Sequence, residues 1–109
     1  MLAQQYRLQK DRDFKLVFEH GKTVSSKFLF FKFKKNDLPI SRFGFIIGKK
    51  ISKKATIRNK IKRRLREIIR KNINNIKPGF DIVVGAKTEV LEKTYQEIEH
   101  EVDCLLKKL

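Results

Sequence analysis

The sequence predicts an α+β fold, a two-layer α/β sandwich in which helices pack against a small sheet. Stretches with a helical period of apolar residues alternate with shorter stretches rich in aromatic and β-branched residues. Residues 80–86 are apolar without alternation, which is typical of a strand covered on both faces. The 109 residues suit a single domain, 1–109, with elements in the order α-β-β-(β)-α-β-α, where one further strand is allowed for.

The first half of the chain predicts a helix and two strands. Residues 11–20 are expected to form a short helix, capped by Asp11 and stopped by Gly21. An aromatic-rich strand follows over residues 24–35, and a second strand over residues 42–50 is its expected hairpin partner. Alternation in the first strand places on one face Leu29, Phe31 and Phe33, and on the other Phe28, Phe30, Lys32 and Lys34.

The second half predicts two longer helices around the buried strand. A basic connector, residues 49–54, leads into a helix over residues 56–73. The last helix is expected over residues 88–109, and Thr94 with Glu97 forms a capping box if it starts late. Its apolar stripe consists of Leu91, Tyr95, Ile98, Val102, Leu105 and Leu109.

Charge is the strongest bulk signal. There are 27 Lys and Arg against 12 Asp and Glu, which gives a net charge of +15. Residues 1–87 have a net charge of +18, whereas residues 88–109 have a net charge of −3. Such a basic body points to a polyanionic partner, most often a nucleic acid, and the alternative is a basic surface kept for solubility.

Other bulk features exclude several classes of protein. No apolar run approaches the length of about 20 residues that spans a bilayer, and the first residues are not typical of a signal peptide. The single cysteine, Cys104, forms no intrachain disulfide. A cytoplasmic location is therefore expected.

The stretch "ATIRNKIKRRLREIIR" concentrates the positive charge on one helix. At helical spacing its core stripe is Ile57, Ile61, Leu65 and Ile68. The opposite side carries Asn59, Arg63, Arg66 and Arg70, and the flanks carry Arg58, Lys60, Lys62 and Arg64. Arginine outnumbers lysine, as expected where forked donors grip phosphate oxygens. The alternatives are a solvated helix face and a helix lying on a membrane surface.

The motifs supply no catalytic constellation. His20 and His100 lie on helices at opposite ends of the chain, and no paired carboxylates near the basic face suit two metal ions. Glu67 is expected to pair with Lys71 or Arg63 along the helix. A zinc site from Glu97, His100 and Cys104 is the only metal alternative, and chance spacing explains those residues better, so no metal site is predicted.

The basic helix also resembles a known family. "KATIRNKIKRRLREIIR" is similar to the signature helix of the bacterial ribonuclease P protein subunit, whose pattern runs roughly K-x-A-V-x-R-N-R-x-K-R-x-x-R-E. The matching positions are Ala55, Arg58, Asn59, Lys62, Arg63, Arg66 and Glu67. The chain departs from the pattern at Thr56, where valine is usual, and at Lys60, which lacks the fork of the second arginine.

The resemblance extends over nearly the whole chain. "RLQKDRDFKLVFEHGK" is similar to the family's opening helix, with Phe14 and Phe18 in place. "FLFFKF" and "FGFIIGKK" resemble two of its strands, with Gly48 where serine is frequent. "GFDIVVGAK" resembles a segment that usually ends in Ala-Arg, and here Lys87 stands for the arginine.

The resemblance implies a fold and a function. The fold is a small mixed sheet like that of ribosomal protein S5 domain 2, with the basic helix in a left-handed β-α-β crossover, against the usual rule. The function is that of the accessory protein of an endoribonuclease, in which an RNA subunit hydrolyses the phosphodiester bond with magnesium ions. The protein binds no cofactor itself. Its partners are ribonuclease P RNA, in a 1:1 complex with monomeric protein, and precursor tRNA, which loses its 5′ leader.

Two surfaces follow from the resemblance. The RNA-binding surface consists of Lys49, Lys50, Lys53, Lys54, Arg58, Asn59, Lys60, Lys62, Arg63, Arg66 and Arg70. A cleft between the first helix and the sheet is expected to take the single-stranded leader, lined by Phe14, Phe18, Phe31, Arg58 and Lys62. Aromatic stacking suits a leader of variable sequence, because every base has a π face. From the residues alone, core packing is the stronger explanation for the phenylalanines, and Phe30, Phe33, Phe43 and Phe45 are assigned to the core.

Two rival functions share the basic charge. A ribosomal protein or RNA chaperone would bind structured RNA without a processing role, and it would need no aromatic cleft beside the arginines. A helix-turn-helix DNA-binding protein would need two adjacent helices, whereas strands flank the basic helix here.

Overall fold

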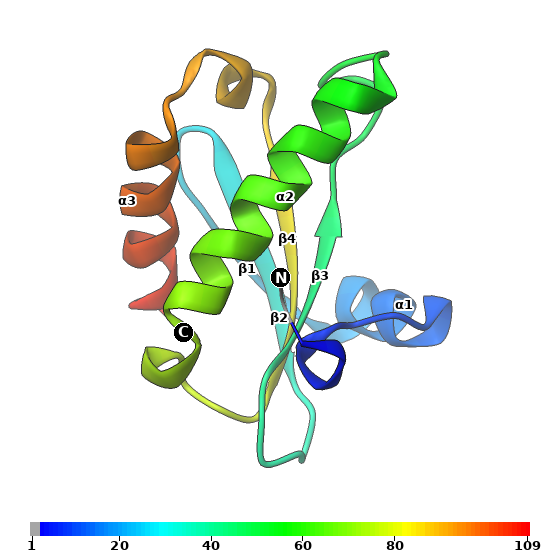
Figure 1. Cartoon of the computed structure of the whole chain (residues 1–109). Coiled ribbons are helices and arrows are strands. Elements are labelled where there is room, and N and C mark those ends of the chain that lie inside the picture. Colours follow the sequence, from blue (N-terminus) through cyan, green and yellow to red (C-terminus); the bar gives the residue numbers. More distant parts are fainter. Residues whose placement is uncertain (1–2) are drawn as a thin grey trace.

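The computed structural model describes residues 3–109 and places helices on both faces of a four-stranded sheet (Figure 1). Its α-helices are α1 (Asp11–His20), α2 (Ala55–Lys71) and α3 (Tyr95–Leu106). Its strands are β1 (Lys22–Ser25), β2 (Leu29–Lys35), β3 (Arg42–Ile46) and β4 (Phe80–Ala86). Short 3-10 helices are η1 (Gln4–Tyr6), η2 (Ile73–Asn75) and η3 (Thr88–Glu92). The α+β class is confirmed, and none of the described helices is long and apolar enough to cross a membrane.

The sheet is mixed, with the strand order β1-β2-β4-β3. β2 pairs with β1 and β4 in antiparallel fashion, whereas β3 pairs with β4 in parallel. The predicted hairpin between β2 and β3 is therefore wrong, because β4 lies between them. In Figure 1, α2 lies in front of the sheet and β4 lies to the left of the parallel strand β3, so the β3-α2-β4 crossover is left-handed. This confirms the handedness that the resemblance implied.

A turn divides the predicted strand over residues 24–35 in two. The Ser26 hydroxyl donates to the Leu29 carbonyl and accepts from the Leu29 N–H, at 3.3 Å each. β1 starts earlier than predicted, at Lys22, and forms a hairpin with β2. This is the additional strand for which the predicted order allowed.

The helix ends agree only in part with the predictions. Lys10, not Asp11, occupies the N-cap position of α1, and Asp11 lies in the first turn, where a carboxylate favours the helix dipole. The predicted helix over residues 88–109 begins as η3, so Leu91 is 45% exposed and lies outside the apolar stripe. α3 starts late, and Thr94 and Glu97 form the capping box.

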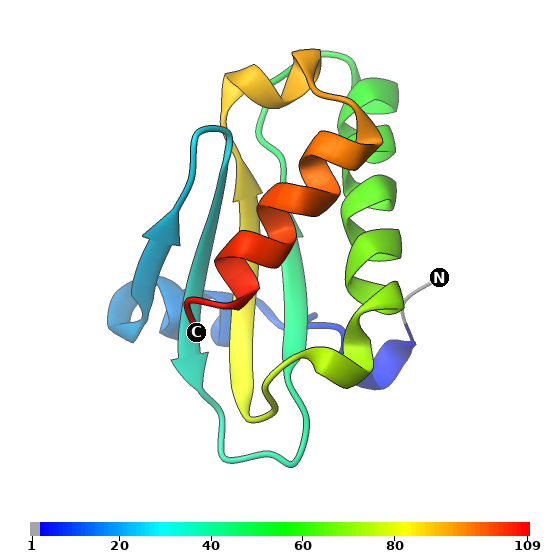
Figure 2. The ribbon, with the colours of Figure 1, turned by 90° about the vertical axis from the view of Figure 1, so that its left-hand side faces the viewer.

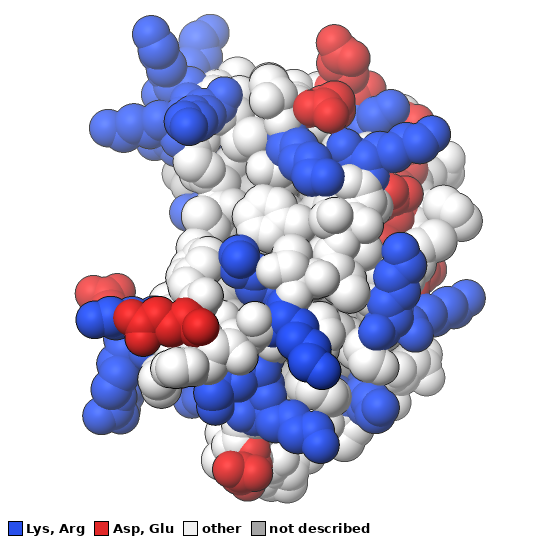
Figure 3. All heavy atoms as spheres, turned by 180° about the vertical axis from the view of Figure 1, so that it is seen from behind, with Lys and Arg blue, Asp and Glu red and all other residues white. Residues whose placement is uncertain are grey.

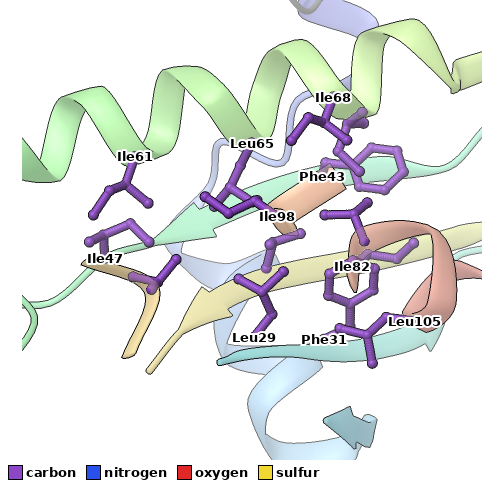
Figure 4. Close-up of a cluster of buried hydrophobic side chains, with 14 of the residues drawn as sticks. Leu29, Phe31, Phe43, Ile47, Ile61, Leu65, Ile68, Ile82, Ile98 and Leu105 are labelled. Atoms are coloured by element: carbon purple, nitrogen blue, oxygen red, sulfur yellow. The ribbon is translucent and has the colours of Figure 1, made fainter. Parts of the chain in front are cut away.

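The main core lies between the sheet and the pair α2 and α3 (Figure 4). From α2, the predicted stripe residues Ile61, Leu65 and Ile68 are buried, and Ile69 joins them. Ile57 only packs against the edge of this core. The strands contribute Leu29, Phe31, Phe43, Ile82 and Val84. The basic helix is thus held by its aliphatic stripe, which leaves its charged sides at the surface.

Among the elements of residues 3–109, only α1 lies on the opposite face of the sheet. Figure 2 shows α1 and α2 on opposite sides of the sheet. The contact of α1 with the sheet is a small cluster of Leu8, Val17 and Val83, with Phe14 packed against it. Much of this face is therefore open to solvent, and the candidate site lies there and on α2.

Candidate nucleic-acid interface

The outer side of α2 is a row of exposed polar and cationic side chains. Asn59, Arg63 and Arg66 are exposed, opposite the buried stripe, as the helical spacing predicts. The first turn of α2 holds no acidic residue, and its last turn adds Arg70 and Lys71. Like charges at this spacing repel, so an anion against this side stabilises the helix.

Glu67 is the acidic residue of α2, and its main partner was not predicted. Its carboxylate accepts hydrogen bonds from the fork of Arg70, three residues on, and the charge of Lys71, one of the two predicted partners, also acts on it. This hydrogen bond lowers the pKa of Glu67 and raises the pKa of Arg70. Arg70 therefore carries less uncompensated charge toward a phosphate than Arg63 does.

The connector before α2 holds four exposed lysines, Lys49, Lys50, Lys53 and Lys54. Ile51 anchors this loop in the core, and its N–H donates to the Gly48 carbonyl at 3.0 Å. Arg58 Nη1 donates to the Ser52 carbonyl at 2.8 Å, which fastens the loop to the helix. Among the described residues no side chain caps α2, so the positive end of its dipole lies beside the lysines and favours an anion.

Two of the predicted cleft residues lie together on the α1 face. The Phe14 ring covers Gly44 of β3, where any Cβ would collide with it. Phe18 is 43% exposed, and Lys32 Nζ lies 5.6 Å from the centre of its ring. Phe14 thus seats α1 on the sheet, whereas Phe18 offers a ring to solvent beside a cation.

Phe31 is not a cleft residue. It is 0% exposed and lies in the main core, on the face of β2 opposite α1. Phe30, which was expected in the core, lies on the α1 face instead, half-buried across Gly85 of β4. Alternation separated the side chains of β2, but it does not tell which set faces which helix. Phe28 was grouped with Phe30 wrongly, because it lies before the start of β2 and is buried in the main core. A glycine inside a buried strand was the available signal, because it marks a close approach such as that of the Phe30 ring.

Arg58 and Lys62 lie on α2, on the other side of the sheet from α1. They share one ridge of the helix with Arg66, at intervals of four residues. The Arg66 guanidinium lies 5.6 Å from the centre of the Phe45 ring, at the edge of β3. A hollow of about 270 Å³ at this edge is lined by Arg7, Leu8, Gln9, Phe14, Phe43, Gly44, Phe45 and Arg66. Arg66 and Phe14 line the same hollow, so Arg66 is the residue of this ridge that lies beside the α1 side of the sheet.

A network of ionic groups that the sequence did not reveal joins α1 to β3 and β4. Arg42 of β3 donates from Nε and Nη2 to both oxygens of Asp81, at 2.8 and 2.7 Å. Its Nη1 lies 3.6 Å from Asp13 of α1, and Asn36 donates to Asp81 at 2.9 Å. The hydrogen bond to Asp81 raises the pKa of Arg42. Arg42 and Asp81 lie 39 residues apart, so no local pattern predicts the pair.

The three residues considered for a zinc site, Glu97, His100 and Cys104, do not come together around one point. The Glu97 carboxylate accepts from the Thr94 N–H at 3.0 Å, within the capping box. Cys104 Sγ lies 3.7 Å from His100 Nε2, and both side chains are exposed. Within residues 3–109, no group of three His, Cys, Asp or Glu side chains is arranged to hold a metal ion.

Figure 3 shows how the charges are distributed over the α1 face. Basic side chains gather at the top left, where Figure 1 places the connector before α2, and again in the lower half. Uncharged surface lies between these groups, above α1. Cations on either side of an aromatic, uncharged floor are what single-stranded nucleic acid requires.

Comparisons with known proteins agree with this geometry. The family model described as Ribonuclease P matches residues 2–109. The chain is 38% identical to the ribonuclease P protein component of Syntrophomonas wolfei over 99% of its own length and 90% of the relative's. The chain belongs to the ribonuclease P protein family.

Solved structures of ribonuclease P proteins have the same fold. The protein from Thermotoga maritima matches with a TM-score of 0.88 and 37% identity, over 94% of this chain and 96% of that one. The Staphylococcus aureus protein matches with a TM-score of 0.86 and 29% identity, over 94% and 93% of the two chains. The chain is thus the accessory protein subunit of ribonuclease P, the endoribonuclease that forms the 5′ ends of tRNA, and its partner is ribonuclease P RNA.

Proposed function

We propose that the chain uses two surfaces, one for the catalytic RNA and one for the 5′ leader of precursor tRNA. The first surface comprises the exposed side of α2 and the connector lysines. The second is the open α1 face, where Phe18 and Phe30 take the bases. One 109-residue domain carries both, as a monomer in a 1:1 complex with the RNA in the cytoplasm. Magnesium ions serve the RNA, and the protein alone holds no cofactor.

The observation that carries the first surface is the row of arginines opposite the buried part of the apolar stripe of α2. Leu65 and Ile68 are completely buried, so the orientation of α2 is fixed and Arg63 and Arg66 must face outward. Arginines that contact phosphates reduce the repulsion between the catalytic RNA and the precursor tRNA, so that the two RNAs can approach each other. The protein then contributes binding and position, whereas the RNA contributes the hydrolysis.

The first test is reconstitution with the organism's ribonuclease P RNA. The purified chain is expected to restore cleavage of precursor tRNA at a low magnesium concentration, at which the RNA alone is slow. An RNA chaperone would aid folding of the RNA and then be dispensable. Continued cleavage after the protein is removed from pre-folded RNA would therefore favour the chaperone function.

The second test addresses α2 directly. The double variant Arg63→Ala/Arg66→Ala is expected to bind the catalytic RNA more weakly and to lower the salt slope of binding by roughly 1–2. Lys107→Ala/Lys108→Ala removes the same charge from the end of α3 and is the matched control. Both variants are expected to melt like the wild type, since all four side chains are exposed. An unchanged salt slope for the α2 variant means that this side of the helix is merely solvated.

A further inference from the structure

The face of the sheet that carries α1 consists of three rows of residues that run across β2, β4 and β3. The strand registers give these rows, starting at the end of the sheet near the connector, as Phe30, Gly85 and Ile46, then Lys32, Val83 and Gly44, then Lys34, Asp81 and Arg42. Neighbouring rows are two residues apart along each strand, which is about 7 Å. The position of α1 on the sheet is therefore defined by the row that it covers.

α1 lies over the second row. The Phe14 ring covers Gly44, and Val17 shares the small apolar cluster with Val83. The first row stays open, because Ile46 is 37% exposed, and Figure 3 shows uncharged surface above α1. The open row and α1 are thus neighbours on the sheet, one row apart.

The seat of α1 also places the Phe18 ring. Lys32 of the second row lies with its Nζ 5.6 Å from the centre of this ring, and Phe30 is one row farther along β2. Because an α-helix is rigid over a few turns, a shift of its first turn displaces Phe18 as well. Whatever holds the first turn of α1 therefore fixes the Phe18 ring relative to the open row.

The third row supplies such a hold. Arg42 donates from Nε and Nη2 to both oxygens of Asp81, which is only 8% exposed. Asn36 also donates to Asp81, at 2.9 Å, so the carboxylate is fixed from two sides. The remaining nitrogen of the guanidinium, Nη1, lies 3.6 Å from Asp13 of α1. Arg42 is thus oriented by the sheet and offers one nitrogen to the helix.

Asp13 is the acidic side chain of α1 that reaches the sheet. In the part of the chain that the structure describes, Asp11 has no cation within 4 Å, and Glu19 pairs with Lys15 inside α1. The Asp13 side chain is 14% exposed. In a chain of net charge +15 that binds RNA, a carboxylate beside the open row opposes binding unless it serves another purpose. The ion pair with Arg42 is such a purpose.

We propose that Asp13 is a positioning residue for the 5′ leader of precursor tRNA. Its ion pair with Arg42 holds α1 over the second row, so that the Phe18 ring stands beside the open row and stacks on a leader base. Asp13 itself does not contact the leader, whose phosphates it would repel. The inference rests on the proposed function of the α1 face.

The test is Asp13→Asn in the reconstituted holoenzyme. Binding of precursor tRNA is expected to weaken about two- to fivefold, as the loss of a partly exposed ion pair allows, whereas mature tRNA binds as before. The sign is decisive, because removal of a negative charge would by itself strengthen the binding of every RNA. At saturating holoenzyme the single-turnover rate of cleavage stays that of the wild type, since the RNA carries out the hydrolysis. Binding of the protein to the catalytic RNA alone does not weaken.

Two variants are the controls for charge and for the carboxylate. Asp11→Asn makes the same change in net charge in the same turn of α1, and is expected not to weaken precursor binding. Asp13→Glu keeps a carboxylate within reach of Arg42, and is expected to retain most of the precursor binding. A melting curve for each variant shows that the fold is retained at the temperature of the binding assay.

A double-mutant cycle tests whether Asp13 acts through Phe18. In a Phe18→Ala background the ring is absent, so its position no longer matters. Asp13→Asn is then expected to change precursor binding by less than about 1.5-fold. A merely structural role of Asp13 would weaken binding by the same factor in both backgrounds.

Three outcomes overturn the inference. These are unchanged or stronger precursor binding in Asp13→Asn, the same loss in Asp11→Asn, and an equal effect of Asp13→Asn with and without the Phe18 ring. The proposed function fails separately, if the wild-type holoenzyme does not prefer precursor over mature tRNA or keeps that preference in full in Phe18→Ala. A preference that depends on Phe18 but not on Asp13 would sink only the inference.

Discussion

The two faces of the sheet differ in what covers them. The face under α2 and α3 is packed with aliphatic and aromatic side chains that are almost all completely buried, such as Leu29, Leu65 and Ile82. The α1 face has a small apolar cluster, two glycines covered by phenylalanine rings, and lysines. Buried apolar area is the main source of folding free energy. The first face therefore stabilises the fold, and the second is free to bind.

This division explains how a chain with net charge +15 remains folded. The repelling charges lie on the outer side of α2 and around the α1 face, while the stripe of α2 lies in the main core. The network of Arg42, Asp81 and Asp13 adds to the apolar contacts of α1 with the sheet, because it fastens α1 to β3 and β4. Substitutions on the two faces should accordingly affect different properties.

The largest expected effect comes from Phe31→Ala on the core face. The side chain is completely buried, so its loss is expected to destabilise the fold by about 3–5 kcal/mol. The binding of precursor tRNA and of mature tRNA is then expected to weaken equally, in proportion to the fraction of the protein that is unfolded. Urea denaturation beside binding assays measures this. Normal stability combined with a selective loss of precursor binding would return Phe31 to the cleft.

The placement of Phe31 also shows how far sequence reasoning extends. Alternation correctly put Leu29 and Phe31 on one face, and the spacing of Ile61, Leu65 and Ile68 gave the buried side of α2. These are local properties of a strand and a helix. Most of the RNA-binding residues are therefore placed at the surface by pattern alone, although their roles stay predictions.

What the sequence did not reveal depends on contacts between distant segments. The insertion of β4 between β2 and β3 is decided by which strands bury the most surface together, not by the turn near Pro39. The packing of α1 on its face of the sheet includes the Phe14 ring, which occupies the space that Gly44 leaves free. Neither the position of β4 nor the face chosen by α1 produces a periodic pattern in the local sequence. The hairpin between β2 and β3 and the place of Phe31 in the cleft were therefore predicted wrongly.

A smaller effect is expected from Phe18→Ala on the α1 face. Because the ring is 43% exposed, its loss is expected to change the melting temperature little. A stacked base contributes about 1–3 kcal/mol, so precursor binding should weaken by that amount while mature tRNA binds as before. Phe18→Trp keeps an aromatic surface and is the matched control. A strongly lowered melting temperature for Phe18→Ala, with equally weakened binding of both tRNAs, would place Phe18 in the core. The α1 face would then also contribute to stability, contrary to the difference between the faces proposed above.

The smallest effect tests whether α3 belongs entirely to the stabilising face. Thr94→Ala removes a helix cap and is expected to destabilise the fold by about 1 kcal/mol. The hydrogen bonds from Thr94 lower the pKa of Glu97, the backbone N–H contributing most. A lowered pKa in the folded state means that the stabilisation is present above the ordinary glutamate value of about 4.3 and is lost as the pH falls through the folded pKa.

Melting curves of the wild type and Thr94→Ala between neutral pH and acid test this capping box. The difference between the two proteins should narrow only slightly in acid, because the N–H of residue 94, the main cause of the lowered pKa, remains in Thr94→Ala and only the contribution of the hydroxyl is lost. Glu89→Gln, in η3 before the box, removes one acidic charge without removing the cap and is the control. The preference for precursor over mature tRNA should be the same in all three proteins at neutral pH. A changed preference in Thr94→Ala would mean that α3 also shapes the leader surface, and that the two faces are less separate than their packing indicates.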